Sequence, residues 1–139
     1  VNDYYLKKEN DNNIEQNINN FNQLDHRTKT KLKRGLIRPS SKIDLHGYNR
    51  KEAFEQLKKF INKCVINEEK CVLVITGRKM GMTGPKGVIR HYLPLWLQEK
   101  SISPNILFHS FAHIKDGGDG ATYILLRKKN KIRGFDERG

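Results

Sequence analysis

Between residues 43 and 128 the hydrophobic positions alternate between the spacing of strands and the spacing of helices. Residues 43–45 end a short strand, and Asn49 with Glu52 has the spacing of a helix N-cap and its capping box. Apolar residues then recur on one helical face, namely Ala53, Phe54, Leu57, Phe60, Ile61 and Cys64. This pattern predicts an amphipathic helix that lies on a sheet.

The next apolar segment is continuous. Residues 71–75 are apolar and mostly β-branched, which predicts the central strand of the sheet. Residues 76–87 contain four glycines and predict a loop. A second helix is predicted over residues 88–97, where Pro94 removes a backbone donor and should kink or shorten the helix.

Two further strands are predicted at residues 106–112 and 121–127. Between them, Gly117 to Gly120 are expected to form an ordinary hairpin connection, because glycine readily adopts positive φ. The resulting order βαβαββ is typical of an α/β two-layer sandwich, in which a mixed four-stranded sheet lies under two helices.

The chain outside this domain is polar. Residues 1–26 contain eight asparagines and predict a flexible segment, with a short docking helix as the alternative. The residues at helical spacing there are Ile14, Ile18, Phe21 and Leu24. Residues 27–42 carry seven bases and no acid and form a basic arm. The domain occupies residues 43–128, and residues 129–139 form a C-terminal tail.

The charge balance favours a polyanionic partner. The 139 residues include 27 Lys and Arg against 15 Asp and Glu, for a formal net charge of +12. Each phosphate that a base neutralises releases a condensed counterion. Because solubility alone asks for a net charge of only about 2 to 8, we expect DNA or RNA as the partner.

Other classes of protein find little support in the composition. There is no apolar run long enough to span a membrane and no secretory leader, so we expect a cytoplasmic protein without a membrane partner. Cys64 and Cys71 lie in or beside apolar stretches and are expected to be buried thiols. His, Cys, Asp and Glu do not occur at metal-ligand spacing, so no tightly bound metal or cofactor is predicted. We expect a monomer.

Asp44 and His46 are the first candidate site. They stand two residues apart on a strand and therefore point to the same side of it. A carboxylate beside an imidazole can transfer protons near neutral pH. The alternative is an ordinary hydrogen-bonded surface pair.

The glycine-rich loop is the second candidate site. Glycines and the start of a helix expose backbone N–H groups to an anion, and nearby bases add positive charge. A solvated loop is the alternative, and the spacing is not that of a Walker loop. The candidate phosphate or nucleic-acid ligands are Thr76, Gly77, Arg78, Lys79, Lys86 and Arg90, together with Lys31, Lys33 and Arg34 of the basic arm.

Taken in order, these motifs resemble the Smr (small MutS-related) domain over about residues 40–128. The resemblance rests on six segments: Ile43-Asp44-Leu45-His46-Gly47, Glu52-Ala53 at the helix start, Val74-Ile75-Thr76-Gly77, Gly87-Val88-Ile89-Arg90, Leu93-Pro94-Leu95-Trp96-Leu97, and the run from Gly117 to Leu126. It implies a fold similar to the C-terminal domain of a translation initiation factor. It also implies an endonuclease, which either nicks DNA in repair or recombination or cleaves RNA on ribosomes in ribosome rescue.

Carried over from the family, the DxH motif falls on Asp44 and His46 as the catalytic residues, and the glycine motif falls on Thr76 and Gly77. His46 would act as general acid or base, while Asp44 would orient it or bind a metal-bound water, so that a requirement for Mg²⁺ or Mn²⁺ stays open. Arg78 and Arg90 would stabilise charge in the transition state. Two alternatives are a non-catalytic module that binds nucleic acid or the ribosome, and an adaptor that binds proteins through residues 1–26.

Overall fold

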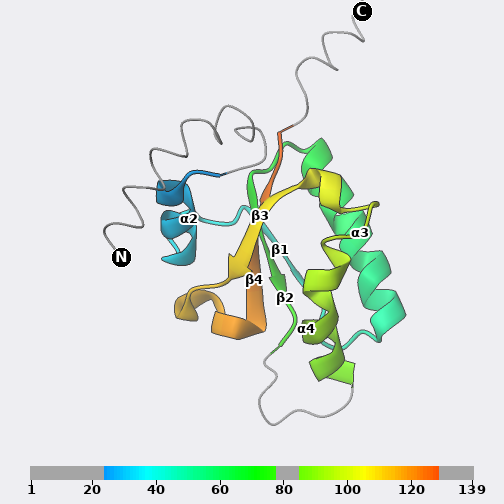
Figure 1. Ribbon diagram of the computed structural model, residues 1–139. Helices are drawn as coiled ribbons and strands as arrows, with labels where there is room; N and C mark the ends of the chain where they lie inside the picture. The colour runs from blue at the N-terminus through cyan, green and yellow to red at the C-terminus, as the bar shows by residue number, and fades with distance from the viewer. Residues whose placement is uncertain (1–23, 78–84, 129–139) are drawn as a thin grey trace, which may run out of the picture.

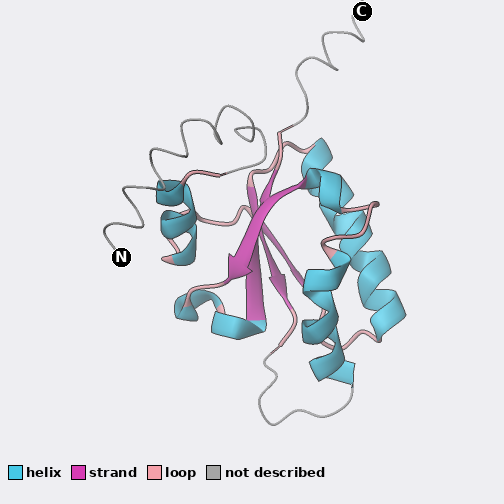
Figure 2. Cartoon of the chain, in the orientation of Figure 1, coloured by secondary structure: helices cyan, strands magenta, loops and turns pink. Residues whose placement is uncertain are grey.

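One mixed four-stranded sheet forms the centre of the molecule. The computed structural model describes residues 24–77 and 85–128, except for the side chains of residues 85–88. The strands are β1 (Ser41–Asp44), β2 (Cys71–Ile75), β3 (Ile106–Phe111) and β4 (Ala121–Leu126). Their order in the sheet is β1-β2-β4-β3, and only β1 and β2 are parallel. The predicted mixed sheet is confirmed (Figure 2).

Helix α3 (Arg50–Ile66) covers one face of the sheet beside α4 (Pro85–Trp96) (Figure 1). The predicted capping box is present, because the Asn49 side chain accepts from the Glu52 N–H and the Glu52 carboxylate accepts from the Asn49 N–H. Four residues of the predicted apolar face are buried, namely Ala53, Leu57, Ile61 and Cys64. They pack on Val72, Val74 and Ile124 of the sheet.

Helix α4 begins three residues earlier than the predicted Val88. A proline at the first helical position has no N–H to leave unpaired and a backbone angle that suits the helix, so Pro85 can start it. Pro94 lies in the last turn, and the helix ends two residues later at Trp96. The helix therefore runs through Pro94, and the kink or shortening expected there stays a prediction.

The basic arm contains a third helix, α2 (His26–Lys33), which the sequence pattern did not predict. Asp25 caps it by accepting from the Thr28 N–H at 2.7 Å. Leu32 is fully buried and packs with Leu73 and Tyr123, whereas Val72 and Val74 pack under α3 and α4. Since successive strand residues face opposite sides, α2 lies on the other face of the sheet (Figure 1). Helices therefore lie on both faces, where two layers were expected.

An ion pair between Arg38 and Asp116 holds the arm to the domain, with the Arg38 side chain 53% exposed and the Asp116 side chain 12% exposed. Both Arg38 terminal nitrogens donate to the Asp116 carboxylate at 2.8 Å, and the hydroxyl of the buried Tyr123 donates to the same carboxylate. The hydrogen bonds from Arg38 outweigh partial desolvation and hold the pKa of Asp116 well below its ordinary value. Arg38 also donates to the Gly35 carbonyl at 3.0 Å. The chain that follows α2 is thus held in one position.

Two short 3₁₀ helices, η2 (Ile114–Asp116) and η3 (Gly118–Gly120), connect β3 to β4, and η1 (Ser103–Asn105) precedes β3. Gly117 and Gly118 have positive φ, as expected for this connection. Within the described residues no helix is long and apolar enough to cross a bilayer. Most of the predicted flexible segment, the docking helix at Ile14 to Phe21 and the tail after Lys128 lie outside the described residues.

Candidate functional site

The predicted motifs meet at one rim of the sheet. Strands β1 and β2 are parallel and end together, since Asp44 pairs with Ile75. Ile75 in turn pairs with Ala121, the first residue of β4, and Phe111 at the end of β3 pairs with Thr122. The DxH motif, the Thr-Gly motif and the Gly-Gly-Asp-Gly connection therefore follow or precede their strands at the same rim.

Asp44 and His46 form a direct hydrogen bond at this rim. The Nδ1 atom of His46 lies 2.6 Å from Oδ1 of Asp44, and the His46 backbone N–H donates to the same oxygen at 3.0 Å. Burial raises the pKa of Asp44, but the two hydrogen bonds from His46 together lower that pKa by more than burial raises it. The pKa of Asp44 therefore lies below its ordinary value. An ionised carboxylate only accepts, so Nδ1 carries the proton. Nε2 has no hydrogen-bond partner within the described residues.

The pair is open to solvent. The Asp44 side chain is 49% exposed and the His46 side chain is 51% exposed. A ligand can therefore reach Nε2 without any movement of the fold. These contacts give the geometry that proton transfer by an oriented imidazole requires.

Gly77 lies next to His46. Its φ is +88°, and a Cβ added there would lie 3.6 Å from the His46 Cβ. The Thr76 and Gly77 N–H groups both donate to the Gly120 carbonyl, at 2.9 and 3.0 Å. The Thr76 side chain is buried, with its hydroxyl 3.4 Å from the same carbonyl. Both N–H groups are thus paired within the protein, and their bonds fix Gly77 beside the imidazole.

Arg90 fastens α4 to the connection before β4. Its Nε donates to the Asp119 carbonyl at 2.9 Å, and Nη2 lies 3.2 Å from an Asp119 carboxylate oxygen. The guanidinium lies 5.1 Å from the centre of the Phe111 ring. With only 18% of its side chain exposed, Arg90 shapes the rim. No spacing in the sequence linked Arg90 to Asp119 and Phe111, so their contribution was missed.

The structure describes only some of the remaining predicted ligands. Arg78, Lys79 and the side chain of Lys86 lie outside the described residues. Lys31, Lys33 and Arg34 are exposed in α2 or directly after it.

The arm and the Asp44–His46 pair lie on the same side of the sheet. Asp44 pairs with Ile75, whose side chain packs with Leu32 of α2 and its neighbours. Partners in adjacent parallel strands point to the same face. A strand of nucleic acid that contacts His46 can therefore also run toward the bases of α2.

No group of three or more His, Cys, Asp or Glu that could hold a metal ion occurs within residues 24–77 and 85–128.

Comparison with known sequences places the domain in a family. The pattern of the Smr domain matches residues 43–127. A protein named ribosome rescue factor SmrB from Vibrio vulnificus (strain YJ016) is 35% identical over 96 residues, which cover 69% of this chain and 49% of that protein. The protein of the same name from Shewanella sp. (strain ANA-3) is 30% identical over the same length, with the same coverage. The chain spans about half the length of these curated relatives.

Solved structures agree with this assignment. YdaL, a stand-alone small MutS-related protein from Escherichia coli, superposes with a TM-score of 0.64 at 25% identity, covering 76% of this chain and 79% of that one. The Smr domain of Thermus thermophilus MutS2 has the same fold, with a TM-score of 0.52 at 20% identity over 63% of this chain and 98% of that one. Since the family pattern runs from β1 to the end of β4 and contains the DxH pair, the chain belongs to the Smr domain family.

Proposed function

We propose that this chain is an endonuclease that cuts a strand of nucleic acid, and that it works on ribosomes in ribosome rescue. The main support is the geometry of Asp44 and His46. Their 2.6 Å hydrogen bond joins a carboxylate to a half-exposed imidazole at the rim where the family motifs meet.

The chemistry follows from the proton on Nδ1. Because Asp44 accepts that proton, the lone pair of the His46 imidazole is on Nε2, which points away from the carboxylate. Nε2 takes the proton of the attacking oxygen, which is that of water or of a ribose hydroxyl. That oxygen forms a bond to phosphorus while the bond to the leaving oxygen breaks, and the leaving oxygen takes a proton from solvent. Asp44 stabilises the imidazolium formed in this step.

Positive charge supports binding of the backbone. The chain carries a net charge of +12, and Lys31, Lys33 and Arg34 are exposed on the side of the sheet to which Asp44 points. Contacts of this kind bind phosphates without reading sequence. We therefore propose that the choice of substrate depends on its structure. The ribosome is proposed as the place of action because the relatives from Vibrio and Shewanella are named ribosome rescue factors.

Strand cleavage by the purified protein tests the proposal. The substrates are an end-labelled single-stranded RNA, mRNA on stalled ribosomes and supercoiled plasmid DNA, each with Mg²⁺, with Mn²⁺ and with a chelator. His46→Ala should lower the cleavage rate by about 10²-fold or more, because a general acid or base contributes roughly 10² to 10⁴-fold. Asp44→Asn should also lower it, with binding of the substrate retained.

A matched control is His91→Ala, since His91 is exposed on α4 and makes no contact with the Asp44–His46 pair. This variant should cleave at the wild-type rate. If His46→Ala cleaves as fast as His91→Ala and binds equally well, the chain does not use this pair for cleavage. Binding to ribosomes without any cleavage by the wild-type protein would establish the non-catalytic alternative.

A further inference from the structure

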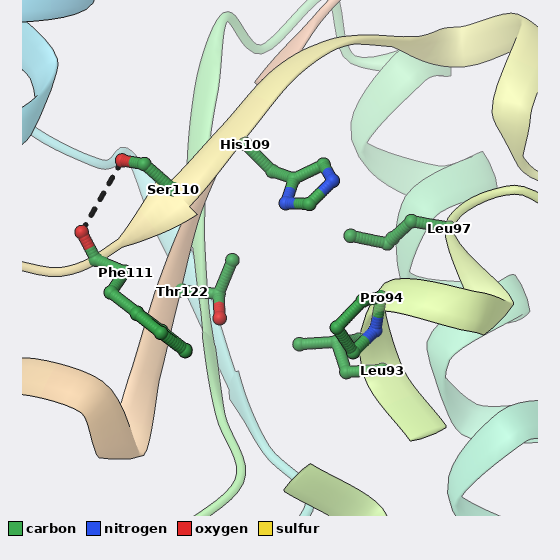
Figure 3. Close-up of a pocket in the computed structure, with 7 residues that line it drawn as sticks. All are labelled: Leu93, Pro94, Leu97, His109, Ser110, Phe111 and Thr122. Atoms are coloured by element: carbon green, nitrogen blue, oxygen red, sulfur yellow. Dashed lines mark hydrogen bonds between the residues drawn. The ribbon is translucent and has the colours of Figure 1, made fainter. Parts of the chain in front are cut away.

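A small cavity lies between α4 and the edge strand β3, on the face of the sheet that α3 and α4 cover (Figure 3). Its volume is about 200 Å³. Most of its walls are apolar, and its main lining residues are Leu93, Pro94, Leu97, His109, Phe111 and Thr122. Pockets for drug-sized ligands usually measure about 300 to 1,000 Å³. The size therefore suits one small flat group.

Two polar side chains in the cavity have unused hydrogen-bonding capacity. Within the described residues neither the His109 ring nor the Thr122 hydroxyl has a hydrogen-bond partner, although Thr122 is only 6% exposed. No fully buried side-chain nitrogen or oxygen in the described part of the chain lacks a partner. The free polar atoms of both residues therefore keep some exposure, and both residues line the cavity. The ring of His109 points toward Leu97 across the cavity (Figure 3).

The mouth of the cavity has an aromatic wall. Phe111 is 54% exposed although it is a large apolar side chain at the end of a strand. The Arg90 guanidinium lies over its ring at 5.1 Å. An exposed aromatic ring beside a cation is the usual platform on which single-stranded nucleic acids stack their bases. Ser110 does not take part, because its hydroxyl donates to the Phe111 carbonyl at 3.2 Å.

We propose that this cavity binds one unstacked nucleobase of a single strand, with His109 and Thr122 as its hydrogen-bonding groups and Phe111 as its stacking wall. The base belongs to the strand whose phosphate lies at His46, and in that respect the inference rests on the proposed function. His109 and Thr122 thereby become specificity-determining residues of the nuclease.

Chemistry favours a base over other occupants. An apolar side chain from a protein partner would fill the cavity but would seal off the His109 ring and the Thr122 hydroxyl, and each unsatisfied group costs free energy. A phosphate would lie against leucine and proline. Burial lowers the pKa of His109, so the ring is neutral near pH 7 and can either donate to a base edge or accept from one. A nucleobase satisfies the apolar walls and the polar groups together.

A series of contacts joins the cavity to the candidate site along the rim. His46 lies beside Gly77, Gly77 donates to Gly120, and Arg90 joins the neighbouring Asp119 to Phe111. Strand β1 and strand β3 are separated by three spacings of about 4.8 Å, or about 14 Å. The Asp44–His46 pair lies on the α2 face and the cavity on the α3–α4 face, so a strand that reaches both must pass over this rim. The path is therefore longer than about 14 Å and takes at least roughly four nucleotides at the 3.4 Å rise of a stacked strand. The pocket would read a base at least that far from the cut.

Nuclear magnetic resonance of the full chain tests the occupant directly. The four nucleoside 5′-monophosphates, ribose 5-phosphate and N-acetyl-leucinamide are titrated separately at equal concentrations. At least one nucleotide should shift the His109 ring and Thr122 signals, whereas ribose 5-phosphate should not. Equal shifts with ribose 5-phosphate, no shift with any nucleotide, or a shift with N-acetyl-leucinamide alone would each overturn the proposal.

Two variants test the pocket on a strand. Phe111→Ala should weaken binding of a single-stranded RNA 12-mer by at least about fivefold, the lower end for loss of one stacking side chain. Ile114→Ala is its matched control, because Ile114 is 74% exposed and outside the cavity. Thr122→Val keeps the shape of the side chain and should change which nucleotide binds best while the fold stays intact. If Phe111→Ala and Ile114→Ala bind alike and Thr122→Val keeps the wild-type preference, the pocket takes no base.

The same experiments separate this inference from the proposed function. Nucleotide titrations in the His46→Ala variant report on the pocket even if the chain never cleaves a strand. Cleavage that depends on His46 but is unaffected by an abasic nucleotide at any position near the cut would retain the nuclease and reject the pocket.

Discussion

The docking of α2 on the sheet gives the sharpest prediction for stability. Leu32 is fully buried in the cluster under α2, and Leu→Ala changes at such positions cost about 2 to 5 kcal/mol through lost burial and the cavity left behind. Helix α2 has only 8 residues and is too short to persist alone. The variant can therefore release the helix, which limits the loss, while Arg38 still holds the following chain to Asp116. We expect Leu32→Ala to lower the free energy of unfolding by about 2 to 3 kcal/mol.

Thermal and urea denaturation measure this loss. For a domain of this size each kcal/mol corresponds to about 4 to 8 °C, so Tm should fall by roughly 10 to 20 °C. Leu36→Ala is the matched control in the same arm, because Leu36 is 57% exposed and should change stability by less than about 0.5 kcal/mol. Hydrogen exchange at the Gly35 amide, which donates to Leu32, should accelerate only in Leu32→Ala. Equal stability of the two variants would show that the arm does not dock in solution.

Further predictions concern the ion pair, the thiols and the first turn of α3. The depressed pKa of Asp116 means that its contribution to stability is complete above its unfolded pKa of about 3.9 and declines as the pH falls below that value. The Tm difference between wild type and Asp116→Asn should therefore shrink below about pH 4, and a constant difference down to the acid limit would contradict the role of the pair with Arg38. Burial raises the pKa of the Cys64 and Cys71 thiols to about 11. Mass spectrometry should therefore find neither thiol alkylated by iodoacetamide at neutral pH in the folded protein, and both alkylated in denaturant. Rapid alkylation of the native chain would refute their burial. Asn49→Ala removes the N-cap of α3 and should cost about 1 kcal/mol in urea denaturation, whereas an unchanged midpoint would mean that water replaces the cap without loss.

The main elements of the domain could be predicted from local pattern. Helix α3 combines a capping box at Asn49 with an apolar face, and both signals lie within a few residues of each other. The continuous apolar run at Cys71 predicted β2 because a strand flanked on both sides and covered on both faces needs no polar side. The sequence pattern predicted the start of α4 at Val88, three residues after its actual start at Pro85. The glycines at 84 and 87 indicate a loop, whereas the helical start at Pro85 depends on backbone geometry.

Helix α2 could not be predicted in the same way. It contributes one fully buried apolar residue, Leu32, among basic neighbours, and one residue makes no periodic pattern. What stabilises its position is distant in sequence: the sheet residues Leu73 and Tyr123 and the carboxylate of Asp116. The charge of the arm was evident from composition, but its attachment to one face of the sheet required the fold.

The candidate site also has one part that the sequence predicted and another that only the fold could show. The sequence by itself predicted that Asp44 and His46 point to the same side, because side chains alternate along a strand with a period of two. In the structure β1 ends at Asp44 and His46 lies in the turn after it, where its ring and backbone N–H still meet the Asp44 carboxylate. Only the tertiary structure decided that Gly77 lies against that imidazole, that Gly120 accepts from Thr76 and Gly77, and that Phe111 and Thr122 close a cavity. The physical reason is that strand pairing brings together residues more than 40 positions apart, and no local periodicity encodes which strand ends will be neighbours.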